Sequence, residues 1–392
     1  LGVVMLFMLA VALLGPLLAR LCAALFGVLL RGGSAPSALA AANSRTNARR
    51  LASALTPIVL AMAFTSTLIF MHTSENRAAD RQLRAGVTAE HVVTSPAGLP
   101  AAAARSAAGA DGVTSAVGVL RTSVLVPVGG AGGDRWLQNS SAQGLSTPRV
   151  SGVLDLDVRT GSLAALRTGT VALDVNLASS AGVSTGDRVA LRLPDGTTAR
   201  PEVVATYGRG LGLARVTLPR ADLTAHVTSA YDSALLVRGG SAADLAALGT
   251  VTDARGYAAG QDTERALNSW ANYTMAAVLG GFAAVAAANT LVMTVLARRR
   301  ELGTLRLVGT TRLQVMRMLR WESLLVSAAG LLLGTAIAAA TLFPMTRGLT
   351  GSAPYVPPLV YAGLAAAVLG LGAAAVTLPG RAVLGKRGRL PG

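Results

Sequence analysis

Residues 297–322 read ARRRELGTLRLVGTTRLQVMRMLRWE and lie between two long apolar runs. The stretch holds seven arginines and two glutamates, so it belongs in water rather than in lipid. Leu302, Leu305 and Val308 recur at helical spacing and predict a short amphipathic helix. A basic, helical connection between two apolar runs indicates a membrane protein with a structured loop at the membrane surface.

The second half of this stretch predicts a corner followed by another helix. Gly309 fits the position just after a helix end, where the backbone often adopts positive φ. Thr311 and Gln314 form a capping-box pattern, so we expect a second helix that begins there and continues into the next apolar run. The same pattern would also suit an interfacial elbow that only anchors two spans, and the pattern alone leaves both interpretations open.

The composition favours a membrane protein along most of the chain. Of the 392 residues, 52% are hydrophobic and 14% are charged, whereas soluble domains carry about 25% charged residues. A spanning helix needs about 20 mostly apolar residues. Five stretches meet this requirement, at residues 1–19, 51–71, 272–297, 323–343 and 359–378.

The segment between the second and third expected spans, residues 73–270, predicts a folded aqueous domain. It holds 18 arginines and 17 acidic residues, a net charge of +1. Residues 189–193 alternate apolar and polar side chains as a strand does, Asp195-Gly196 predicts a hairpin turn, and a returning strand is expected through Val203 and Val204. Further expected elements are strands at 115–128 and 171–175, a helical continuation of the second span at 75–84, and a short helix at 241–248 capped by Ser241.

The distribution of charge predicts the topology. Residues 31–50, 298–322 and 381–392 together carry 15 basic and two acidic side chains. Basic loops stay in the cytoplasm, and these three stretches alternate correctly with the five spans. The large domain is then outside, and topology alone explains the net charge of +16, so we expect no nucleic-acid partner. The expected fold class is a multi-span α-helical membrane protein with a large mixed α/β extracytoplasmic domain.

The sequence offers little for catalysis. Cys22 is the single cysteine, which excludes a cysteine-based metal site. His91 and His226 are not at metal-ligand spacing, and we expect Asp155 and Asp157 to lie in an exposed strand or turn. No G-x-x-x-x-G-K-[ST] motif is present, so the chain cannot build an ATP-binding phosphate loop. We therefore expect a domain without metal or enzymatic activity that binds a partner mainly through apolar surface, because its net charge gives little steering.

The fourth expected span contains a candidate site of helix packing. Gly330 and Gly334 have the spacing that lets membrane helices approach closely, although a sequence this rich in alanine and glycine also produces that spacing by chance. No acidic residue lies within any expected span, which disfavours a transporter driven by ions or protons.

The stretch RRRELGTLRLVGTTRLQVMRMLRWESLLV resembles the signature of the FtsX-like ABC transporter permease family, also called the MacB type. Members carry an R-x-x-E-(I/L)-(G/A)-x-(L/M)-(R/K)-x-x-G-(A/T) run between two spans. The matching residues are Arg298, Glu301, Leu302, Gly303, Arg306, Gly309 and Thr310, with Glu322 beyond them. The segment SALAAANSRTNARRLASALTPIVLAMA is similar to the family's basic amphipathic segment, with Ala48 in place of the usual proline. The order of one span, a large outer domain and three spans also agrees.

The resemblance implies a division of the chain into parts. Since the chain begins at Leu1 inside an apolar run, it looks like the second unit of a permease with two tandem units. The expected parts are the last helix of a preceding unit with an interfacial segment (1–30), a basic cytoplasmic segment (31–50), a transmembrane helix (51–72), an extracytoplasmic MacB-core-like domain (73–270), a permease domain of three spans with a coupling loop at 298–322 (271–384), and a basic tail (385–392).

The resemblance also implies a function. The chain would be the permease subunit of an ABC transporter in the plasma membrane of a bacterium. ATP would be bound by a separate ATPase subunit and no cofactor by this chain. Other expected partners are membrane lipid, a preceding permease unit or second permease chain, and an extracytoplasmic substrate or protein. The residues expected to couple to the ATPase are Arg298, Glu301, Leu302, Leu305, Arg306, Gly309 and Thr310.

Two matters stay open at this stage. Members of the family export or extract peptides, lipids or lipoproteins, or pass force to a cell-envelope partner, and the sequence does not choose among these. A different class of function, a ligand-sensing membrane protein that signals through a partner, would also suit a chain with a large outer domain.

Overall fold

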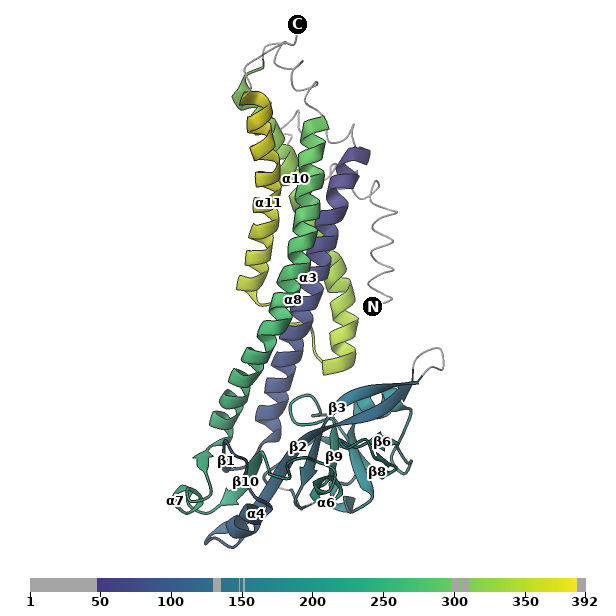
Figure 1. The fold of residues 1–392 in the computed structure, drawn as a ribbon, viewed down its shortest axis with the longest axis vertical. Helices are drawn as coiled ribbons and strands as arrows, with labels where there is room; N and C mark the ends of the chain where they lie inside the picture. The colour runs from purple at the N-terminus through teal and green to yellow at the C-terminus, as the bar shows by residue number, and fades with distance from the viewer. Residues whose placement is uncertain are drawn as a thin grey trace. The chain divides into compact units, whose positions relative to one another are not determined.

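The computed structural model describes residues 48–129, 135–147, 149–150, 152–297, 304 and 310–385 (Figure 1). The chain divides into two compact units. The first, here called the membrane unit, comprises the chain up to Ser74 and from Ser269 onwards, and the second, the sheet unit, comprises Glu75–Asn268. Both boundaries fall inside helices, α3 (Ala48–Gly86) and α8 (Ala254–Ala297), so each of these helices contributes residues to both units.

Four helices among the described residues are long and apolar enough to cross a membrane. They lie in α3, α8, α10 (Arg312–Thr350) and α11 (Pro358–Gly385). Each coincides with one of the last four expected spans. The first expected span, residues 1–19, lies outside the described residues, as does the basic segment that follows it up to residue 47.

Helix α10 begins where the sequence predicts. The Thr311 hydroxyl accepts a hydrogen bond from the Gln314 amide at 3.3 Å, and the Gln314 side chain accepts one from the Thr311 amide at 2.9 Å. This reciprocal pair is the expected capping box. Helix α10 then continues without a break into the apolar run and ends at Gly351, whose φ of 67° is the left-handed conformation that glycine tolerates.

Pro57 lies inside α3, and the helix continues through it. Proline removes one backbone donor at this point, a loss that membrane helices accommodate through local adjustment and neighbouring groups.

The sheet unit is built on one sheet of eleven strands. The main path runs in the order β11-β1-β10-β2-β3-β9-β5-β8-β4, with β6 and β7 attached at β2. The strand bounds are β1 His91–Thr94, β2 Val113–Gly129, β3 Arg135–Leu145, β4 Val158–Gly161, β5 Thr170–Asp174, β6 Leu191–Arg192, β7 Thr198–Ala199, β8 Glu202–Tyr207, β9 Val216–Pro219, β10 Ala234–Gly239 and β11 Thr250–Thr252.

The long antiparallel pair of β2 and β3 forms the centre of this sheet. It stays in register from Val119 opposite Leu145 to Gly129 opposite Arg135. The β3–β9 and β5–β8 pairs are parallel and the others are antiparallel, so the sheet is mixed. Short helical segments complete the unit: α4 Ala101–Ala108, η1 Leu163–Ala165, α5 Val175–Ala181, α6 Arg220–Thr224 and α7 Ala242–Leu245. The expected mixed α/β class is thus confirmed.

Most of the local predictions for this unit hold. Strands β2 and β5, the continuation of α3 to Gly86, and α7 with its Ser241 cap all lie where expected. The turn at Asp195-Gly196 joins β6 to β7, and Gly196 has a φ of 88°. The expected returning strand is present. The Val203 amide donates to the Asp187 carbonyl at 2.8 Å, and the Val203 carbonyl accepts from the Gly186 amide at 2.8 Å. Val203 and Val204 belong to β8, which pairs in addition with β5 and β4, and the sequence did not indicate those pairings.

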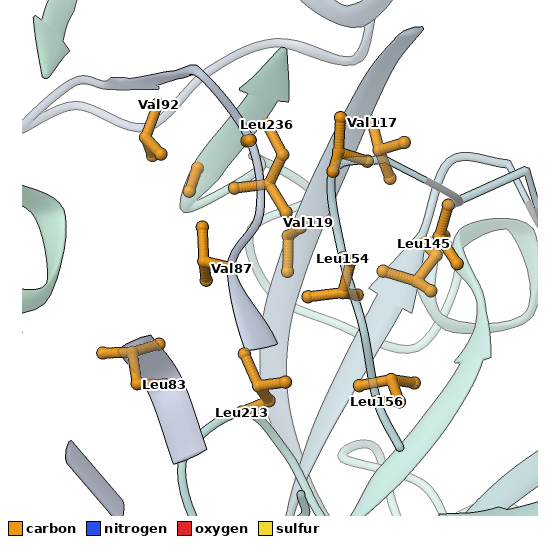
Figure 2. Packing of buried hydrophobic residues seen from close by; sticks show 14 of the residues in the cluster. Leu83, Val87, Val92, Val117, Val119, Leu145, Leu154, Leu156, Leu213 and Leu236 are labelled. Carbon is orange, nitrogen blue, oxygen red and sulfur yellow. The ribbon is translucent and has the colours of Figure 1, made fainter. Parts of the chain in front are cut away.

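The ends of both long helices contribute to one apolar cluster of the sheet unit. Leu83 and Val87, at the end of α3, belong to this cluster together with residues of β2, of β10 and of the 153–156 segment. Figure 2 shows Leu83, Val87, Leu154 and Leu213 close to one another. Tyr257 and Ala258, from the first turns of α8, belong to the same cluster. The sheet unit therefore holds α3 and α8 by burying their apolar side chains.

A buried ion pair joins two parts of the sheet unit. Arg220 Nε donates to Asp232 Oδ1 at 2.7 Å, and the two side chains are 14% and 2% exposed. Burial raises the pKa of Asp232, and the hydrogen bond and charge of Arg220 oppose that rise. A Cβ on Gly118 of β2 would overlap the other carboxylate oxygen, so glycine there makes room for the pair.

We predict that breaking this pair destabilises the sheet unit far more than breaking an exposed one. Asp232→Ala leaves the arginine buried and unpaired, which should cost about 3–5 kcal/mol. Glu90→Ala, which removes an exposed carboxylate 3.9 Å from Arg238, is the control and should cost less than about 1 kcal/mol. Limited proteolysis of the purified chain during thermal unfolding measures both. Equal midpoints for the two variants would contradict the assignment.

Candidate functional site

Most of the expected coupling residues cannot be placed. Arg298, Glu301, Leu302, Leu305, Arg306 and Gly309 lie outside the described residues. Thr310 is described and is partly buried, immediately before the capping box that starts α10. The amphipathic helix expected before Gly309, and its positive φ, therefore remain predictions.

The two glycines expected to pack a span lie against α3. A Cβ built on Gly330 would overlap the Ile58 side chain, and one on Gly334 would lie 2.6 Å from the Met62 Cβ and 3.1 Å from the Val59 carbonyl oxygen. Any side chain at these positions would have to displace α3. The absence of side chains thus lets α3 and α10 approach at close to backbone contact, as small residues do between membrane helices.

Helix α10 contacts α11 through a different face from the one that contacts α3. A Cβ on Gly372 would overlap the Ser327 hydroxyl and lie 3.7 Å from the Ser323 carbonyl oxygen. Both serines are buried, at 0% and 2% exposure. Helix α10 is therefore the central helix of the membrane unit, with close-packed contacts to α3 and to α11.

The loop between α10 and α11 is hydrogen-bonded to α3 where α3 reaches the end of the membrane unit. The Thr73 hydroxyl donates to the Tyr355 carbonyl at 3.0 Å, and the Tyr355 amide donates to the Ser74 hydroxyl at 2.8 Å. Ser74 in turn donates to the Phe70 carbonyl at 2.6 Å. Phe70 also lies against Tyr361 of α11, with ring centroids 6.4 Å apart. These bonds fix the last turns of α3 in this unit to the loop.

In the sheet unit, the end of α3 is fixed to the segment that joins β8 to β9. Gln82 Oε1 accepts from the backbone amides of Leu211 and Gly212, at 2.9 and 3.1 Å. A Cβ on Gly212 would overlap the Ala79 carbonyl oxygen and lie 2.5 Å from the Leu83 amide. The clash would be with helix backbone, which cannot rotate away. Glycine at position 212 is therefore required for this approach.

The start of α8 is fixed to the central strand of the same sheet. Arg121 of β2 donates from Nη2 to the Tyr257 hydroxyl at 3.0 Å and from Nη1 to Gln261 Oε1 at 3.2 Å. The Asp253 carboxylate caps the helix by accepting from the Gly256 amide at 2.7 Å. One arginine in the middle of an apolar strand thus bonds two successive turns of α8.

Three of the acidic and histidine candidates, Asp155, Asp157 and His226, have structural partners. Asp155 forms an ion pair with Arg209, whose hydrogen bond lowers the pKa of that carboxyl, and Asp157 pairs with Arg159 at 2.6 Å. His226 Nδ1 lies 2.7 Å from Asp195 Oδ2, and this contact is the main cause that lowers the pKa of Asp195 to about 2. Within the described ranges, no three histidine, cysteine or acidic side chains gather as a metal site would require.

The contacts described in the two units therefore attach α3 and α8 to other segments, and they do not arrange groups for catalysis. The side chains that fix α3 and α8 were not singled out from the sequence. Arg121 had a usable signal, since it interrupts the valine- and leucine-rich stretch of residues 115–128, where a charge needs a partner. No pattern in the sequence indicated the roles of Gln82 and Gly212, because these roles depend on a contact between segments 130 residues apart.

Comparison with known families identifies the C-terminal part of the chain. Residues 273–387 match the model of the FtsX-like permease C-terminal family. This part of the chain is similar to the C-terminal domain of FtsX-like permeases. The resemblance seen in the basic loop at 298–322, which lies inside this match, is thereby confirmed.

Two solved structures have a weak similarity to the chain. One is the periplasmic region of MacB from Actinobacillus actinomycetemcomitans, at 12% identity, covering 46% of this chain and 94% of that one with a TM-score of 0.34. Another is the extracellular domain of the noncanonic ABC-type transporter YknZ from Gram-positive bacteria, at 19% identity, covering 42% and 89% with a TM-score of 0.30. Comparison with curated proteins gives no match.

We predict opposite effects for alanine at two glycines of α10. Gly348 has no atom within 4 Å of a built Cβ, so Gly348→Ala should be neutral or stabilise the helix by up to about 1 kcal/mol. Gly334→Ala should destabilise the membrane unit by about 1–3 kcal/mol, because its Cβ meets Met62. Thermal unfolding of the purified chain in detergent compares them. A stabilised Gly334→Ala would show that α3 does not pack there.

Alanine at Gly212 should loosen the attachment of α3 in the sheet unit. Its Cβ meets helix backbone, so we expect faster amide exchange in residues 79–87 and 208–214 than in the wild type. Gly260→Ala in α8 is the control, since a Cβ there meets nothing within 4 Å. Hydrogen exchange followed by mass spectrometry measures the difference. Unchanged exchange in both variants would argue against the close contact.

Proposed function

We propose that this chain is the permease subunit of an ABC transporter that converts ATP hydrolysis by a separate ATPase into movement of the sheet unit. The observation that carries the proposal is the FtsX-like permease match at residues 273–387, which includes the basic loop. Such a loop, rich in arginine and preceding the capping box of α10, is suited to dock on a cytoplasmic subunit. The chain supplies no phosphate loop of its own, so ATP must be bound elsewhere.

The path of the movement follows the two helices that contribute to both units. A shift of the basic loop would act on α8, which precedes it, and on α10, which follows it. Helix α10 would pass the shift to α3 through Gly330 and Gly334, since close-packed contacts do not yield. Helices α3 and α8 would then act on the sheet through Gln82 and Arg121.

The proposed orientation puts the basic stretches in the cytoplasm and the sheet unit outside, in a bacterial plasma membrane. A preceding permease unit or a second permease chain would complete the transporter. The cargo is a peptide, a lipid or a lipoprotein, or else the sheet unit passes force to a protein of the cell envelope. Purification of the native complex tests the whole proposal, because an ATP-hydrolysing subunit should co-purify. A partner with signalling activity and no ATPase would instead favour the ligand-sensing alternative.

Labelling of single cysteines should place the basic loop and the sheet unit on opposite sides of the membrane. In a Cys22→Ser background, Ser106→Cys and Thr304→Cys put a thiol at an exposed position of the sheet unit and of the loop, respectively. A membrane-impermeant maleimide added to intact cells should label position 106 and reach position 304 only after permeabilisation. Labelling of both in intact cells would overturn the proposed orientation.

Substitutions in the loop should uncouple ATP hydrolysis without affecting insertion. A left-handed Gly309 would make Gly309→Val cost about 1–2 kcal/mol locally, which would misalign the docking surface. Glu301→Ala should act similarly, because it removes the carboxylate that lies between Arg300 and Arg306 in the sequence. The measurement is substrate-stimulated ATPase activity of the purified complex. Asp111→Ala, at an exposed turn of the sheet unit, is the control and should behave as wild type. Wild-type stimulation in all three variants would exclude a docking role for the loop.

A further inference from the structure

The sheet unit contains a cleft with a volume of about 880 Å³ beside the end of α3. Its walls come from the 149–158 segment, from residues 162–164, from Thr88 and from Arg238 of β10. Clefts that hold small ligands in proteins are about 300–1,000 Å³ in volume, so the cleft is large enough for one.

The floor of the cleft is apolar. Val150, Leu154 and Leu156 line it and are themselves 6%, 4% and 1% exposed, so they are held in place by the core behind them. Val158 also lines the cleft and is 38% exposed, which leaves a large apolar side chain open to water. A hydrocarbon group lying on this floor would remove that apolar surface from water.

Two arginines stand at the cleft. Arg149 is exposed, and no side-chain partner of it is recorded among the described residues. Arg238 is about half exposed, with its Nε 3.9 Å from Glu90, a distance too long for a hydrogen bond. Its Nη1 donates one long hydrogen bond, of 3.4 Å, to the Gly152 carbonyl, and its other guanidinium N–H groups have no recorded acceptor among the described residues. Glu90 is itself engaged as an acceptor for the Gly239 amide at 3.0 Å. Both guanidinium groups therefore keep donors available for a ligand.

Among the described residues that line the cleft, the one acidic side chain is paired with a neighbouring arginine. Asp155 forms an ion pair with Arg209, and the resulting hydrogen bond lowers the pKa of the carboxyl, so the pair persists at neutral pH. The charge that remains at the cleft is that of the two arginines, offset in part by Glu90. Gly152 makes room for one of them, since a Cβ there would lie 2.6 Å from Arg238 Nη1.

We propose that this cleft binds an amphiphilic anion, with Arg149 and Arg238 taking a phosphate or carboxylate and the apolar floor taking its hydrocarbon part. The planar guanidinium group donates two parallel hydrogen bonds to such oxyanions, which suits it to this task. The inference goes beyond the proposed function, because binding here requires no ATPase. It also refines the expectation from the sequence that the sheet unit binds a partner mainly through apolar surface. The floor of the cleft is apolar, and the charges of the two arginines act only at short range.

A local reporter on the full chain tests the proposal. Ala164, exposed at the cleft, is replaced by cysteine in the Cys22→Ser background and labelled with an environment-sensitive fluorophore. The chain is placed in zwitterionic nanodiscs and titrated with octyl phosphate, with inorganic phosphate and with octanol. We expect a saturable response to octyl phosphate at concentrations at least about tenfold below those needed for either of the others, because only it satisfies both parts of the cleft.

Charge-removing variants separate this site from general partitioning into the nanodisc. Arg149→Gln and Arg238→Gln should each weaken octyl phosphate binding by about tenfold, and Arg238→Lys should weaken it less. Arg105→Gln, at an exposed arginine of α4, is the matched control and should leave binding unchanged. Equal responses in all variants, or an equal response to octanol, would overturn the proposal. An equally strong response to inorganic phosphate would show that the cleft binds an anion without using its apolar floor, which would also overturn the proposal of an amphiphilic ligand.

Discussion

Direct contact of glycines with α3 is the constraint on which both units depend. In the membrane unit, Gly330 and Gly334 let α10 approach Ile58 and Met62. In the sheet unit, Gly212 lies against the helix backbone near Ala79 and Leu83. Apolar side chains gain little by leaving lipid for each other, so close van der Waals contact of this kind is what holds membrane helices together. A helix that packs this closely in both units is well suited to transmit a displacement from one unit to the other.

Polar contacts determine which segments move with α3. The Asp155 amide donates to the Gly86 carbonyl at 2.7 Å, and the Thr88 amide donates to the Val153 carbonyl at 3.1 Å. The segment that ends α3 is thus hydrogen-bonded to the segment that lines the arginine cleft. A ligand in the cleft and a displacement of α3 would act on the same few residues. Binding and movement would then be linked, since each would alter the free energy of the other by the same amount.

The sequence predicted features that depend on local chemistry. The capping box at Thr311, the Asp195-Gly196 turn and the long strand β2 each follow from residues a few positions apart, and each is present. The family could be recognised for the same reason, because its signature is one continuous stretch. Pairings between distant segments could not be predicted. Nothing near Val203 indicates that its strand joins β5, and nothing near Gln82 indicates that it bonds to Gly212.

The central claim is that ATP hydrolysis by a partner moves the sheet unit relative to the membrane unit. Spin labels at Ser106→Cys and Ala353→Cys, in the Cys22→Ser background, report the distance between the two units by pulsed electron resonance. The measurement uses the complex with its co-purified ATPase, without nucleotide and after hydrolysis of ATP in the presence of vanadate, which traps ADP in the ATPase. The account predicts that the distance distribution shifts between these two states. An unchanged distribution in a complex that hydrolyses ATP would contradict it.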